Sequence, residues 1–168
     1  MSKLIRRLAY GASLALITSL PLSPALAIQT EQCADVLQFP FAASPAADAQ
    51  AGGRQGRISL GRVTWIALSP VETLTWARAP ERVPPAGTKG AIAVVEIAEE
   101  GSYAIALSDG AWVDVVAPTG HVRSAGHGHG PACSGVRKVV DYRLAPGSYH
   151  IQLSGAEADR LRILVLRR

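Results

Sequence analysis

The histidines and cysteines of this chain cluster in one glycine-rich segment. The string Gly126-His-Gly-His-Gly-Pro-Ala-Cys133 holds two of the four histidines and one of the two cysteines. Because His127 and His129 lie between glycines, we expect their rings to project from a loop whose backbone can approach a ligand closely. Neutral imidazole is a good ligand for copper, iron and zinc. The segment therefore predicts a transition-metal site, with His121 as the nearest additional ligand.

Further ligands would have to come from neighbouring strands. Asp114 lies on the strand predicted before this segment, and His150 lies on a later strand that sheet pairing could bring close. Two alternatives stay open: a solvated loop whose histidines bond to nearby backbone, and a loop that contacts an organic or anionic ligand or a protein partner. The chain has no H-E-x-x-H, C-x-x-C or G-x-S-x-G motif, so the sequence assigns no catalytic residue.

Trp112 and Asp114 share one face of a predicted strand. An aromatic ring beside a carboxylate on an outer face would suit a carbohydrate or another small ligand. The alternative is a partly buried tryptophan that closes the edge of the fold.

Residues 1–27 have the pattern of a secretory signal. Lys3, Arg6 and Arg7 precede an apolar stretch over 8–22, and Ala25-Leu-Ala27 forms a cleavage site. The apolar stretch is too short and too interrupted for a membrane span. The sequence therefore predicts export to the periplasm of a Gram-negative envelope, by the general or the twin-arginine route, and no membrane-spanning segment in the mature chain.

The charge balance argues against nucleic-acid binding. The chain has 17 Lys and Arg against 13 Asp and Glu, and without residues 1–27 the balance is 14 against 13. The remaining basic residues are scattered, with no stripe interleaved with aromatic residues. The expected partners are a metal ion, a small molecule or another envelope protein.

Export to an oxidising compartment favours a disulfide. Cys33 and Cys133 are the only cysteines, so they can form one intramolecular pair. The bridge would close a loop of about 100 residues and stabilise the fold by roughly 4–5 kcal/mol in the chain-entropy treatment. It would also remove Cys133 as a metal ligand.

The elements that must position these residues are strands. We expect one domain: residues 28–56 form an N-terminal segment and connector tied by the disulfide, and 57–168 form a β-sandwich or jelly roll of about eight or nine mostly antiparallel strands. No helix is expected outside the signal. Short alternating runs predict strands near 57–60, 62–69, 91–98, 102–108, 111–117, 121–125, 136–144, 148–154 and 161–167.

Two further features constrain this fold. Residues 76–90 contain three prolines and two glycines, which predicts a long extended loop. Residues 161–166 are almost continuously apolar, which predicts a central strand covered on both faces.

Two segments carry a resemblance to known proteins: Gly101 to Val116 and Gly126 to Gly155, with His-Gly-His-Gly-Pro-x-Cys-Ser-Gly as the distinctive string. The chain resembles, over residues 90–166, a group of small exported alphaproteobacterial proteins that are often called homogentisate 1,2-dioxygenase. That name implies non-haem iron held by two histidines and a glutamate, which would make His127 and His129 the ligands here. The dioxygenase itself is a much longer cytosolic cupin enzyme.

The patterns Gly101-Ser-Tyr103 and Gly147-Ser-Tyr149 are also similar to those of small secreted β-sandwich accessory domains, which bind rather than catalyse. Three hypotheses follow: a periplasmic binding or accessory protein with a metal in the His-Gly loop, a non-haem iron dioxygenase, and an envelope-interaction module without metal.

Overall fold

Alternation of apolar and polar residues produces strands along almost the whole described chain. The computed structural model describes residues 41, 47–49, 56–131 and 134–168. The predicted signal, Cys33 and Cys133 lie outside these residues. The strands are β1 (Ala47–Ala49), β2 (Gly56–Ile58), β3 (Thr64–Ala67), β4 (Ser69–Pro70), β5 (Lys89–Ile97), β6 (Gly101–Leu107), β7 (Trp112–Ala117), β8 (Gly120–Val122), β9 (Ser124–Gly128), β10 (Lys138–Leu144), β11 (Gly147–Ala156) and β12 (Arg160–Arg167).

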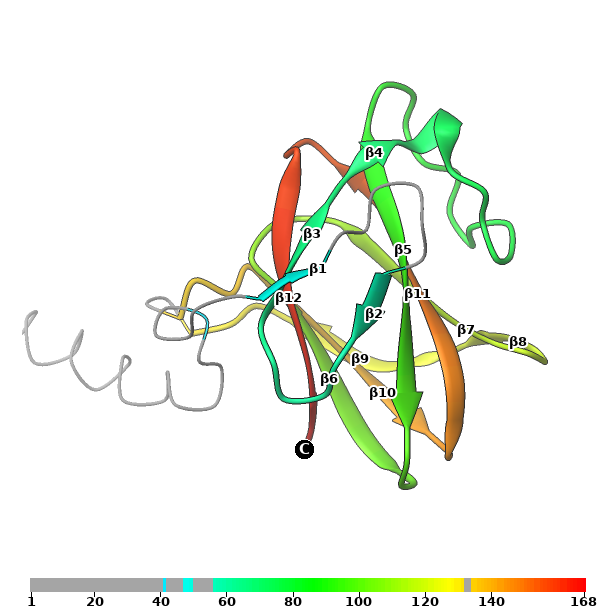
Figure 1. Ribbon diagram of the computed structural model, residues 1–168, viewed down its shortest axis with the longest axis vertical. Helices are drawn as coiled ribbons and strands as arrows, with labels where there is room; N and C mark the ends of the chain where they lie inside the picture. Colours follow the sequence, from blue (N-terminus) through cyan, green and yellow to red (C-terminus); the bar gives the residue numbers. More distant parts are fainter. Residues whose placement is uncertain (1–40, 42–46, 50–55, 132–133) are drawn as a thin grey trace, which may run out of the picture.

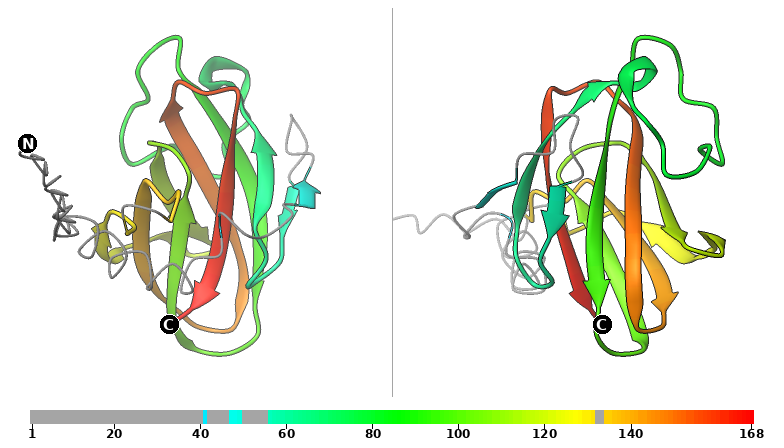
Figure 2. Two further views of the ribbon diagram at one scale, coloured as in Figure 1. Left: turned by 90° about the vertical axis from the view of Figure 1, so that its left-hand side faces the viewer. Right: turned by 45° about the vertical axis from the view of Figure 1, so that its right-hand side comes forward.

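These strands form two sheets that pack as a β-sandwich, as the sequence predicted (Figure 1). Sheet A has the order β1-β3-β12-β6-β10-β9, and sheet B has the order β2-β5-β11-β7-β8 with β4 paired to β5. The pairs β1–β3 and β2–β5 are parallel, and the others are antiparallel. The longer strands run roughly along the long axis of the molecule (Figure 2). The described helical structure is a single 3-10 turn, η2 (Val71–Thr73), and no described helix is long and apolar enough to cross a membrane.

The main core lies between the two sheets. On β6 the side chains of Tyr103, Ile105 and Leu107 enter this core, and Val113 and Val115 enter it from β7. Side chains at every second position point to the same face, so the intervening residues of each strand must face outward. On β7 those outward residues include Trp112 and Asp114.

The last strand is central and covered on both faces, which confirms the prediction from its apolar run. β12 lies between β3 and β6. Its Leu161, Ile163 and Val165 belong to the core between the sheets, whereas Leu164 packs in a second cluster with Phe41 on the outer face of sheet A.

Two tyrosines fix the turns that precede their strands. The hydroxyl of Tyr103 donates to the carbonyl of Glu99 at 2.7 Å, and the hydroxyl of Tyr149 donates to the carbonyl of Ala145 at 2.9 Å. Both bonds reach back four residues across the turn before the strand, in the manner of the tyrosine corner of β-sandwiches. This repeated contact gives the Gly-x-Tyr pattern a structural reason.

Two expectations differ from the structure. The His-Gly segment was expected as a loop, but Ser124–Gly128 forms β9, because its backbone pairs with the exposed edge of β10. No strand was expected within the segment and connector over 28–56, but Ala47–Ala49 pairs in parallel with β3.

We predict that Gly90→Ala destabilises the sandwich strongly. A Cβ at Gly90 would lie 2.2 Å from the carbonyl oxygen of Leu153, a backbone atom that cannot swing aside. Overpacking of this kind typically costs about 1–3 kcal/mol, so the urea midpoint should fall clearly. Gly128→Ala is the matched control, because a Cβ at Gly128 meets nothing within 4 Å. Equal midpoints for the two variants would contradict the close approach of β5 and β11 at this point.

Candidate functional site

The proline-rich segment over 74–88 packs against the outer face of sheet B. In Figure 1 it lies at the right of the molecule, on the same side as the β7–β8 hairpin. Beneath it, Asp114 and Gln152 are 3% and 1% exposed although both point away from the main core. These two residues are register partners on β7 and β11. We call residues 74–88 the strap.

Polar side chains of the sheet hold the strap through its backbone. Gln152 accepts from the Arg78 amide at 3.1 Å and donates to the Arg78 carbonyl at 3.0 Å. Asp114 Oδ2 accepts from the Glu81 amide at 3.2 Å, and His121 Nε2 lies 2.9 Å from the carbonyl oxygen of Ala79. A buried polar group without a partner is costly, so these contacts fix where the strap can lie.

The strap brings a carboxylate to the two candidate ligands of β7 and β8. One ligand atom each from Glu81, Asp114 and His121 lie within 4.8 Å of one another. Glu81 is exposed, Asp114 is buried and His121 is partly buried. Among the described residues, this is the one group of three or more such side chains that could hold a metal ion.

The hydrogen bonding of His121 suits a metal ligand. A carbonyl oxygen only accepts, so the contact with Ala79 requires Nε2 to carry the hydrogen. In the neutral imidazole Nδ1 then has a free lone pair, and this atom is buried without a hydrogen-bond partner. Metal-binding histidines commonly have this arrangement, in which the other ring nitrogen donates to a backbone carbonyl or a carboxylate.

Asp114 is oriented by two donors. The Trp112 indole Nε1 donates to Asp114 Oδ1 at 2.7 Å, and the Glu81 amide donates to Oδ2. The carboxylate is therefore held in one position, and each oxygen keeps a second lone pair. Its charge also acts on the core: burial, followed by the charges of Asp114 and Glu81, raises the pKa of Tyr142, whose hydroxyl donates to the carbonyl of Val113 at 2.9 Å.

The other predicted site residues lie apart from this group. His127 is exposed on β9, in register with Val140 of sheet A, and His129 is exposed just after that strand. His121 belongs instead to sheet B, because the chain changes sheets between β8 and β9. His150 shares a row with His121, but Val116 of the intervening strand lies between them.

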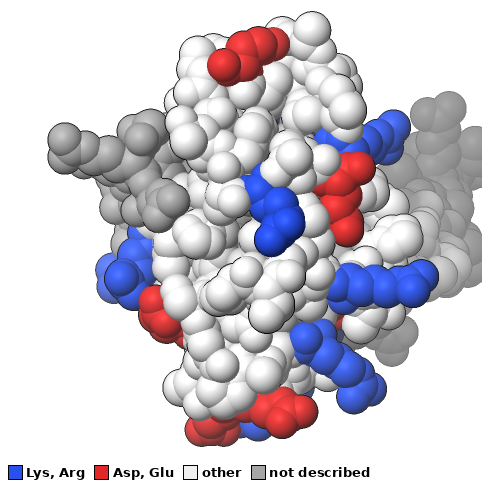
Figure 3. All heavy atoms as spheres, turned by 90° about the vertical axis from the view of Figure 1, so that its right-hand side faces the viewer, with Lys and Arg blue, Asp and Glu red and all other residues white. Residues whose placement is uncertain are grey.

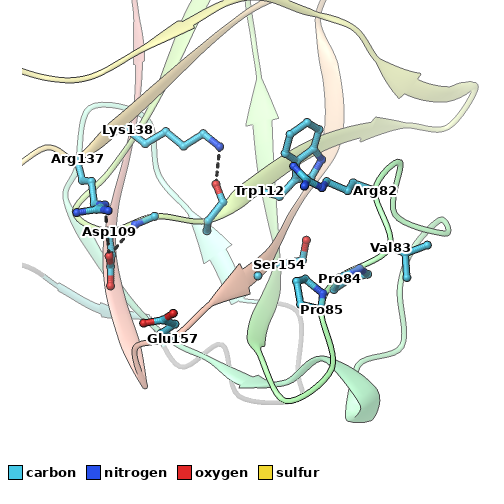
Figure 4. A pocket seen from close by; sticks show the side chains of 13 residues that line it. Arg82, Val83, Pro84, Pro85, Asp109, Trp112, Arg137, Lys138, Ser154 and Glu157 are labelled. Carbon is cyan, nitrogen blue, oxygen red and sulfur yellow. Dashed lines mark hydrogen bonds and ion pairs between the residues drawn. The ribbon is translucent and has the colours of Figure 1, made fainter.

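A cleft with a volume of about 490 Å³ lies beside Trp112. In Figure 4, Arg137, Asp109 and Glu157 stand on one side of it, Arg82, Val83, Pro84 and Pro85 stand on the other, and Ser154 lies between them. Lys138 extends toward Trp112, its Nζ 5.4 Å from the ring centroid, and the Arg82 guanidinium lies 5.6 Å from the same centroid. Lys138 Nζ donates to the carbonyl of Ala111 at 2.6 Å.

Charged side chains of both signs line this cleft. Burial and the neighbouring charge of Arg82 lower the pKa of Lys138. Asp109 lies 3.9 Å from Arg137 in an exposed ion pair. Elsewhere on this side of the molecule, basic and acidic side chains are interspersed rather than gathered by sign (Figure 3).

Sequence reasoning identified Asp114, His121 and Trp112 but missed Glu81, Arg82 and Lys138. The prolines around Glu81 mark an extended loop, but nothing in that pattern shows which face the loop covers. Nothing in the local pattern around Lys138 shows that its side chain reaches Trp112. The register of β7 with its neighbouring strands decides which of these side chains lie close together. That register depends on pairing across the whole sheet.

The comparisons with known proteins give little about function. No protein-family model matches the chain, and no match is found among curated proteins. Among solved structures, the chain is similar to the pre-peptidase C-terminal domain of a collagenase from Bacillus anthracis, with 11% identity and a TM-score of 0.38. The match covers 73% of this chain and 97% of that domain. This TM-score is too low to support an inference about the function of this chain from that domain.

We predict that Gln152→Leu loosens the strap while the sandwich stays folded. The substitution keeps the volume roughly similar but removes both hydrogen bonds to Arg78, so the Arg78 amide and carbonyl lose their partners on the sheet. Amide hydrogen exchange over residues 76–83 should become faster, with little change in β6 and β12. Ser148→Ala, on the same strand but bonded to the exposed Glu96, should leave strap exchange unchanged. Parent-like exchange in Gln152→Leu would contradict the anchoring role of Gln152.

Proposed function

We propose that this chain is an exported, periplasmic β-sandwich accessory domain that binds a divalent transition-metal ion through Glu81, Asp114 and His121. The single observation that carries the proposal is the buried, unpartnered Nδ1 of His121 beside two carboxylates, with its other ring nitrogen held by Ala79. A bound ion would give that lone pair a partner.

The ligand types indicate the class of metal. One imidazole and two carboxylates form a mixed nitrogen and oxygen set, which suits zinc, iron and manganese better than copper(I) or calcium. Glu81 lies on the strap and the other two ligands lie on sheet B. The ion would therefore tie the strap to the sheet, and its binding would stabilise the fold.

This proposal moves the metal site predicted from sequence. His121 and Asp114 stay as candidate ligands, while the His127 and His129 segment becomes a second candidate, supported by the exposure of both side chains at the edge of sheet A. The dioxygenase resemblance implied two histidines and one carboxylate. The group assembled here has one histidine and two carboxylates.

We predict that the purified exported protein binds about one equivalent of zinc or ferrous ion, and that His121→Ala and Glu81→Gln each weaken binding at least about tenfold. Isothermal titration calorimetry measures the affinity, and the thermal midpoint of the parent should rise with metal. Glu81 is exposed, so Glu81→Gln should stay folded even if His121→Ala does not.

The His127→Ala/His129→Ala double variant is the control, and it should bind metal like the parent. If the double variant loses the metal while His121→Ala and Glu81→Gln keep it, the site is the His-Gly segment. If the parent binds none of zinc, iron, manganese or copper, the metal proposal is rejected and the chain is a binding module for another ligand.

A further inference from the structure

The cleft beside Trp112 is lined by residues that are not ligands of the proposed metal site. Its floor includes Ser154 and Gly155, where the β11–β5 pairing has a register shift and Gly155 has φ +74°. A bulge of this kind locally bends a strand and often occurs beside binding sites. The volume of about 490 Å³ is in the range of small-molecule sites.

Two cations in this cleft have no carboxylate partner. Arg82 and Lys138 come from the strap and from β10, and both lie within 5.6 Å of the Trp112 centroid. Among the described ion pairs, neither side chain takes part in one. Both cations line the same cleft, so an anion bound there would be attracted by both. The cleft therefore favours a ligand with a negative charge.

The other walls indicate what carries that charge. Trp112 is 37% exposed and Val83 is 87% exposed, and with Pro84 they give one side an apolar surface. Asp109 and Glu157 line the opposite side. Ionised carboxylates only accept hydrogen bonds, so they suit hydroxyl groups rather than a second anion. Cations, an apolar wall and hydroxyl acceptors together match a sugar acid.

We propose that this cleft binds acidic saccharides, with the ligand carboxylate bound by Arg82 and Lys138, the sugar ring against the exposed part of Trp112, and sugar hydroxyls on Asp109 and Glu157. The cleft is lined by none of the three proposed metal ligands, so binding there requires no bound ion. Trp112 contributes to both places, because its ring lines the cleft while its Nε1 donates to Asp114.

Calorimetric titration with α-1,4-linked digalacturonate tests the proposal. We expect binding that weakens with added salt, and a loss of at least about tenfold for the uncharged dimethyl ester of the same disaccharide. Arg82→Gln and Lys138→Gln should each weaken binding by a similar factor. Arg82 is exposed, so its variant tests the site even if the half-buried Lys138 variant unfolds.

Arg143→Gln is the matched control, because Arg143 is exposed on β10 and does not line the cleft. It should bind like the parent. The parent should also still bind the disaccharide after dialysis against EDTA, which separates this site from the metal site. Binding of acetate or inorganic phosphate as tightly as digalacturonate would overturn the assignment to sugar acids. Equal binding of the ester, parent-like binding by Arg82→Gln, or no binding at millimolar ligand would overturn the proposal itself.

Discussion

Both candidate sites depend on one constraint: the buried polar side chains on the outer face of sheet B must be hydrogen-bonded. Asp114 and Gln152 point away from the main core yet are almost completely buried. Burial without partners would be costly, and the strap supplies those partners from its own backbone. Proline limits the conformations of the unfolded strap, so less entropy is lost when it is ordered. A hydrophobic cover would bury the same surface but would not fix the strap at one register.

Both candidate sites arise from this docking. The amide of Glu81 bonds to Asp114, which brings the Glu81 side chain near His121, and the next residue, Arg82, is thereby placed over Trp112. Both sites therefore depend on the docked strap, although they would bind ligands of opposite charge. One oxygen from each of the two carboxylates lies within 4.8 Å of a ring nitrogen of His121, whereas Arg82 and Lys138 lie over the tryptophan ring. A ligand at either place would also contact the strap, so binding at each should oppose its detachment.

Much of the fold follows from local patterns. The side-chain period of a strand is two, so the sequence assigns each residue of β6 and β7 to one of two faces. The apolar run of β12 in the same way indicates that both of its faces are covered. The His-Gly segment shows the limit of this reasoning. Glycines around His127 indicate a loop, yet the edge of β10 offers hydrogen bonds that make Ser124–Gly128 a strand. Pairing with β10 outweighed the weak preference of this glycine-rich segment for a loop.

The sequence by itself determined the β-sandwich class, the central position of the last strand and the common face of Trp112 and Asp114. Each of these depends on the spacing of residues that are near in the chain. Only the tertiary structure decided which histidine meets which carboxylate. His121 and His127 are six residues apart but lie in different sheets, whereas Glu81 reaches His121 across forty residues. The docking of the strap depends on strand register and on the partners of buried polar groups, and both are properties of the assembled sheets rather than of any segment.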